Sequence, residues 1–87
     1  MSELKDYIAN PTDYKKRLAA MRVIQALVRE DDDLSDTSMG YVIQKAAIAE
    51  AVASNIAGQG VNMAVITERS MPVFNRVLGE VKAMVGE

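Results

Sequence analysis

The sequence predicts an all-α protein: a small antiparallel bundle of three main helices with one or two short helices, completed by homodimerisation. Apolar residues recur at the spacing of an amphipathic helix in three stretches, residues 12–29, 38–57 and 70–85. Capping residues and helix-breaking segments separate these stretches. The one β-branched run, residues 61–67, would be a single strand with no partner. The 87 residues are therefore expected to form one helical domain, residues 1–87.

A short helix is expected over residues 2–9, at the start of the chain. Ser2 can cap its first turn through the side-chain oxygen. The pair Asn10-Pro11 should end it, because the residue before a proline is disfavoured in the α region.

The helix predicted over residues 12–29 has an unusually wide apolar face. Thr12 can cap it, and the negative charge of Asp13 favours the positive end of its dipole. Its apolar side chains cover more than half of the circumference: Tyr14, Leu18, Ala20, Met21, Val23, Ile24, Leu27 and Val28. A surface helix normally has an apolar arc of about 100° or somewhat more, so this helix should contact more than one other helix. We expect it to be the central helix of the fold or of a dimer.

The same helix carries a basic stripe, since Lys15, Arg22 and Arg29 recur at every seventh residue. Ala19 and Ala26 lie between them and would make the stripe flat enough to dock a partner. The stripe is a candidate site for phosphate or for an acidic protein. The alternative interpretation is the solvated side of an amphipathic helix.

Residues 31–38 are predicted to form an acidic loop. Asp31, Asp33 and Ser35 alternate as the ligands of a Ca²⁺ loop do. The rest of that pattern is missing, because Asp36 stands where a glycine is required and Val42 where a bidentate glutamate is required. We therefore expect a solvated linker and no metal site.

The helix predicted over residues 38–57 is built from small residues and should end at Gly58 in left-handed geometry. One side of it forms an alanine-rich ridge: Val42, Ala46, Ala49, Ala53 and Ala57. Rows of alanine let helices approach closely, so the ridge is expected to mark a tight antiparallel contact.

Residues 61–67 are open to two interpretations, and a short helix capped by Asn62 and reaching Arg69 is favoured over a strand. The order of Gly60, Asn62 and Thr67 also resembles the turn of a helix-turn-helix. Phosphate contacts need Lys or Arg, and Arg69 would be the only cation of that recognition helix. A packed turn is therefore preferred.

The last helix is expected over residues 70–85, with Ser70 as its cap. Its apolar residues follow one face: Phe74, Val77, Leu78, Val81, Met84 and Val85.

Composition limits the function. The chain has no Cys, His or Trp, and no motif places a base beside a nucleophile, so we expect no enzyme and no cofactor. A net charge of −2 offers no bulk attraction to nucleic acid or to an anionic membrane. The start of the chain has no signal-peptide pattern, and no apolar run is long enough to span a bilayer. A cytoplasmic location is the corresponding expectation.

The leading hypothesis is a non-enzymatic protein–protein interaction module: an adaptor, an inhibitor or an assembly component, of the kind common among viral and mobile-element accessory proteins. Its expected partners are a second copy of the chain and another protein. A helix-turn-helix-like regulator that binds DNA and a purely structural self-assembling protein are the alternatives. The candidate partner-binding residues are Lys15, Arg22, Arg29, Tyr14, Tyr41 and Met63.

Overall fold

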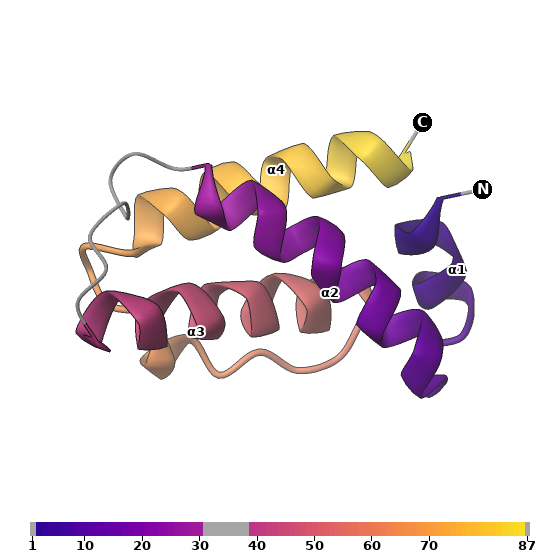
Figure 1. The fold of residues 1–87 in the computed structure, drawn as a ribbon, viewed down its shortest axis with the longest axis horizontal. Helices are drawn as coiled ribbons and strands as arrows, with labels where there is room; N and C mark the ends of the chain where they lie inside the picture. Colours follow the sequence, from indigo (N-terminus) through magenta and orange to yellow (C-terminus); the bar gives the residue numbers. More distant parts are fainter. Residues whose placement is uncertain (1, 31–38, 87) are drawn as a thin grey trace.

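The computed structural model describes residues 2–30 and 39–86. These residues form four α-helices and one turn of 3-10 helix, and they contain no strand (Figure 1). The all-α prediction is confirmed. In chain order the elements are α1 (Glu3–Ala9), α2 (Tyr14–Arg29), α3 (Met39–Ile56), the 3-10 helix η2 (Met63–Val65) and α4 (Met71–Gly86).

The helix starts follow the capping pattern, with one correction. The backbone N–H of Lys5 donates to Ser2 Oγ at 3.4 Å, so Ser2 caps α1 as predicted. At α2 the cap is Asp13 rather than Thr12, because Asp13 Oδ1 accepts from the backbone N–H of Lys16 at 3.2 Å. A short aspartate side chain in extended backbone geometry satisfies one of the free N–H groups of the first turn.

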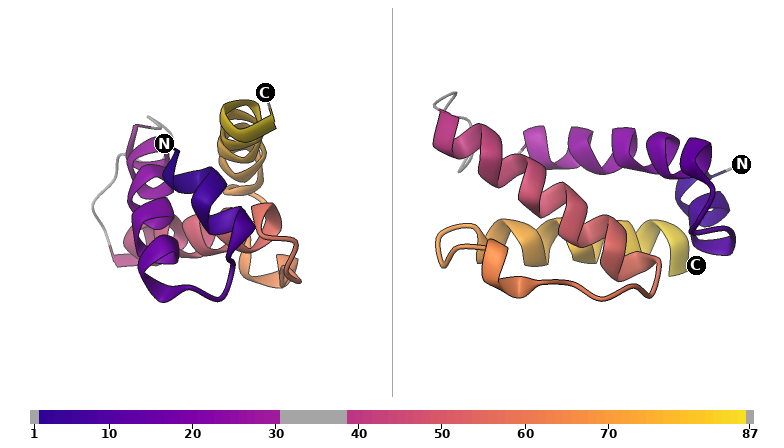
Figure 2. Two further views of the ribbon diagram at one scale, coloured as in Figure 1. Left: turned by 90° about the vertical axis from the view of Figure 1, so that its right-hand side faces the viewer. Right: turned by 90° about the horizontal axis from the view of Figure 1, so that it is seen from below.

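Helix α2 is central, as its wide apolar face predicts, because it packs against α1, α3 and α4. It runs opposite to α3 and α4, whereas α3 and α4 run in the same general direction (Figures 1 and 2). The expected antiparallel arrangement therefore does not hold for α3 and α4. Residues 57–70 return along α3 before α4 begins (Figure 1). Helix α1 packs against α2 and α4, and both chain ends lie at its end of the molecule.

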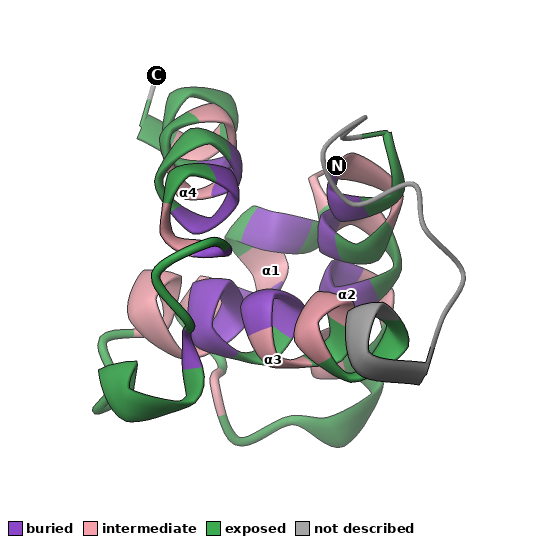
Figure 3. Ribbon diagram, turned by 90° about the vertical axis from the view of Figure 1, so that its left-hand side faces the viewer, coloured by how far each residue is buried: buried purple, intermediate pink, exposed green. Residues whose placement is uncertain are grey.

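The core lies between the facing sides of the four helices (Figure 3). Helix α2 contributes Ala20, Met21, Ile24 and Val28, but Tyr14 and Leu18 of its predicted apolar face are 71% and 41% exposed. The other buried apolar residues are Leu4, Tyr7, Ile48, Ala49, Ala51, Val52, Ala53, Ile66, Val73, Phe74, Val77 and Val81. The apolar face of α2 is therefore narrower than predicted by at least these two residues.

The alanine-rich ridge of α3 is buried only in part. Ala49 and Ala53 lie in the core, while Val42 and Ala46 are exposed. Gly58 has a φ of 74° and ends the helix as predicted, and the N–H of Gln59 donates to Ser54 O at 2.9 Å.

The short helix predicted from Asn62 to Arg69 is wrong in extent. Asn62 Oδ1 accepts from the N–H of Ala64 at 3.1 Å and caps a single 3-10 turn, after which Ile66 is extended. Ile66 is buried in the core, and the burial of its side chain favours this extended backbone over a continued helix.

Ser70 precedes α4 as predicted, but its hydroxyl does not bind the helix it precedes. Ser70 Oγ donates to Gln44 Oε1 on α3 at 2.7 Å, and the N–H of Ser70 donates to Thr67 Oγ1 at 3.2 Å. Because Ser70 is only 1% exposed, these bonds satisfy a buried polar group and fix the start of α4 against α3.

Replacing Ala49 by Leu is expected to lower the free energy of unfolding by about 1–3 kcal/mol, because overpacking forces neighbouring side chains and backbone to shift. Ala46→Leu on the same helix is the matched control, since Ala46 is exposed and its change should stay within about 0.5 kcal/mol. Urea denaturation followed by circular dichroism measures both. Equal effects of the two substitutions would contradict the placement of Ala49 between packed helices.

Candidate interaction surfaces

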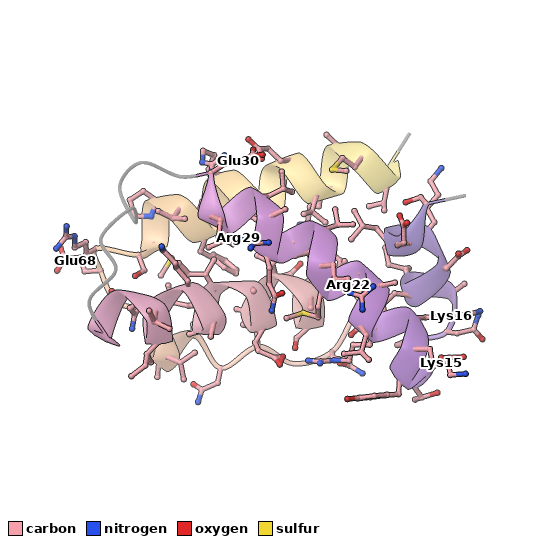
Figure 4. All side chains as sticks on the ribbon, in the orientation of Figure 1. Lys15, Lys16, Arg22, Arg29, Glu30 and Glu68 are labelled. Atoms are coloured by element: carbon pink, nitrogen blue, oxygen red, sulfur yellow. The ribbon has the colours of Figure 1, made fainter. Side chains whose placement is uncertain are left out.

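The solvent side of α2 forms one surface, here called the outer face of α2: Tyr14, Lys15, Leu18, Arg22, Gln25 and Arg29. All six residues are exposed. Lys15, Arg22 and Arg29 follow the length of the helix in Figure 4. Four of the predicted partner-binding residues therefore lie together, because Tyr14 begins the same face.

The outer face of α2 contains no acidic residue. The residues three and four positions from Arg22 are Leu18, Ala19, Gln25 and Ala26, all uncharged. A solvated helix commonly places opposite charges at these spacings. Helix α4 does so, since Arg76 Nη1 donates to Glu80 Oε1 at 2.7 Å. Lys15, Arg22 and Arg29 form no ion pair with any residue in the described part of the chain.

An ion pair joins α2 to α3 beside this face. Arg17 Nη2 donates to both carboxylate oxygens of Glu50, at 2.8 Å to Oε1. The hydrogen bond to Glu50 raises the pKa of Arg17, partial burial lowers it, and the charge of Glu50 raises it again. The guanidinium thus stays charged, but both side chains remain partly exposed, so the pair contributes little to stability.

Tyr7 of α1 lies next to this ion pair. Its ring is fully buried, and its hydroxyl is close enough to Arg17 to contribute to the raised pKa of that guanidinium. The hydroxyl nevertheless makes no hydrogen bond with any described residue. Arg17 therefore places one guanidinium among α1, α2 and α3.

A second surface, here called the α3 groove, lies between α3 and the returning segment. Its volume is about 310 Å³, and the residues that line it are Ala47, Glu50, Ala51, Ser54, Gly60, Val61, Asn62 and Val65. Val65 is 47% exposed, and Ile43, one helical turn before Ala47, is 58% exposed. The groove is thus an apolar hollow with large apolar side chains beside its opening.

The remaining predicted partner-binding residues lie elsewhere. Met63 is 39% exposed on η2, which lies beside α3 and next to Asn62 of the groove. The side chain of Tyr41 lies outside the described residues. The α3 groove itself was not expected from the sequence, because the favoured helix at residues 62–69 places Val61 and Val65 in a different arrangement.

The other candidate sites find no support in this geometry. A recognition helix would have to start near Asn62, where the chain forms one 3-10 turn and then becomes extended. The acidic loop, residues 31–38, lies outside the described residues. In the part of the chain that the structure covers, His, Cys, Asp and Glu form no group of three or more that could hold a metal ion. Among those residues there is also no helix with the length and hydropathy needed to cross a membrane.

Tyr7→Phe is expected to leave the free energy of unfolding unchanged or to raise it by up to about 1 kcal/mol, since it removes a buried hydroxyl that makes no hydrogen bond. Tyr7→Ala, which removes the ring, should cost about 3–5 kcal/mol. Chemical denaturation distinguishes the two. A loss of more than about 1 kcal/mol in Tyr7→Phe would show that the hydroxyl bonds to Arg17.

Comparison of the chain with known proteins found no relative. It matches no protein family, no curated protein and no solved structure.

Proposed function

We propose that the protein is a non-enzymatic protein–protein interaction module that binds its partner through the α3 groove. The observation that carries this proposal is the apolar hollow of about 310 Å³: it is lined by the exposed Val65, and the exposed Ile43 lies one helical turn before the lining residue Ala47. Apolar patches that a folded chain leaves exposed commonly mark interaction sites. A pocket of this kind accepts one or two apolar anchor side chains, the usual centre of an interface. Adaptor, inhibitor and assembly component are all roles of this type.

The polar groups of the groove support binding rather than catalysis. Glu50 is held by Arg17, and the side-chain oxygen of Asn62 accepts from the N–H of Ala64. The hydroxyl of Ser54 would need a positioned base to act as a nucleophile, and the chain has no histidine.

A second copy of the chain is the second candidate occupant. A domain of this size buries only about 60–65% of the surface that its unfolded chain exposes, so its core gains from self-association. Seven large apolar side chains are exposed among the described residues, and three of them, Ile43, Met63 and Val65, lie in or beside the groove. Homodimerisation through the α3 groove would cover them.

The test replaces Ile43 and Val65 together by Asp in the full chain. The matched control is Met84→Asp, because Met84 is 51% exposed but lies on α4. Affinity capture followed by protein identification compares wild type with both variants, and light scattering over a concentration series measures self-association. Circular dichroism and thermal melting confirm that the variants fold.

The groove variant is expected to lose a stoichiometric partner, or its own dimer, that wild type and Met84→Asp retain. Charged groups placed in a desolvated apolar contact carry a large penalty, so the loss should be at least tenfold in affinity. Equal retention of partner and dimer by wild type and the groove variant would overturn the proposed role of this surface.

A further inference from the structure

We infer that the outer face of α2 is a docking site for an acidic amphipathic α-helix of a partner protein. This surface is separate from the α3 groove, and its charge and the spacing of its cations indicate the partner.

Charge is strongly segregated in this chain. Five of the ten Lys and Arg residues lie in α2, and none of the twelve Asp and Glu residues does. The rest of the chain then has five cations and twelve acids, which gives it a net charge of −7, whereas α2 has a net charge of +5. Of the five cations of α2, Arg17 pairs with Glu50, and the other four form no ion pair with any described residue. The outer face of α2 is therefore a local attractor for negative groups.

The surroundings of Arg22 point to a contact surface rather than to a solvated helix. Its neighbours along the helix are Leu18 and Ala19 on one side and Gln25 and Ala26 on the other. None of these side chains is charged, so none can form an ion pair with the guanidinium in place of a partner's carboxylate. The two alanines have small side chains, so a partner could approach the helix closely on that side of the basic stripe. Arg and Tyr are the residue types most enriched where protein interfaces are energetically important, and the face holds Arg22, Arg29 and Tyr14.

The spacing of the cations matches an α-helix. Seven residues of helix rise by about 10.5 Å, so Lys15, Arg22 and Arg29 mark three positions over about 21 Å. A partner helix with a carboxylate at every seventh residue has the same spacing of about 10.5 Å between its charges. When it packs alongside α2, each carboxylate can therefore lie next to one of the three cations. Tyr14, 71% exposed, and Leu18, 41% exposed, lie between the stripe and Arg17 and provide apolar contact for such a helix.

Nucleic acid fits this face less well. Neutralising three phosphates gives weak, salt-sensitive affinity, and the remaining net charge of −7 repels a long polyanion. Exposed Tyr14 and Leu18 on the same face favour a partner with apolar side chains beside its charges.

The experiment uses the full chain and three labelled synthetic peptides, each of about three heptads and each designed as a soluble helix. The first has Glu at every seventh residue beside a stripe of Leu. The second has Gln in place of those Glu residues. The third has the same composition as the first, with its Glu residues moved onto different sides of the helix. Fluorescence anisotropy measures binding at low and at moderate salt, and a labelled DNA duplex of about 20 base pairs is measured in parallel.

Wild type is expected to bind the first peptide at least about tenfold more tightly than the second or the third. Arg22→Glu should weaken that binding by more than tenfold, and changing the central Glu of the peptide to Lys should restore it. Lys82→Glu is the matched control, since it changes the net charge equally at an exposed position on α4 and should change affinity less than twofold.

Equal binding of the first and third peptides would overturn the inference, since spacing would then not matter. Equal loss in Arg22→Glu and Lys82→Glu would also overturn it, because net charge alone would explain the binding. Binding to the duplex in preference to the first peptide would assign the face to nucleic acid instead.

Discussion

The structure depends on the burial of one side of α2. Ala20, Ile24 and Val28 are almost completely removed from solvent, and the helix that carries them packs against all three other helices. Each buried side chain of the size of Ile or Val contributes about 1.5–3 kcal/mol, while the ion pair of Arg17 and Glu50 contributes at most about 1 kcal/mol. Apolar contact with α2 therefore holds α1 and α3 in place, whereas α4 packs mainly against α3 and less extensively against α2.

The two sides of α2 are under different constraints, because one side packs in the core and the other faces solvent. The inner side is constrained by packing against three neighbours, so a change of one methyl group there is felt throughout the core. The outer side has no packing role, because Lys15, Arg22 and Arg29 are exposed and unpaired within the described residues. Residues that do not pack in the core can be substituted to suit a partner without loss of stability. The outer face of α2 consists of such residues.

The sequence predicted the helices and most of their ends because these depend on neighbouring residues. Ser2, Asn10 and Gly58 act locally, and each was placed correctly. The path of residues 57–70 was predicted wrongly because it depends on distant contacts: Ile66 enters the core and the Ser70 hydroxyl bonds to Gln44. The basic stripe could be seen in advance, since one helix carries it. The α3 groove could not, because its two walls meet only in the folded chain.

The returning segment also has a consequence for the order of folding. Since α3 and α4 run in the same general direction, their pairing cannot form by a tight turn and requires residues 57–70 to be laid along α3 first. The contacts of α1 with α2 are close in sequence and form at low entropic cost, whereas those of α4 with α3 and α2 are more distant. We therefore expect α4 to dock last and to open first, and its opening would break the buried hydrogen bond between Ser70 and Gln44.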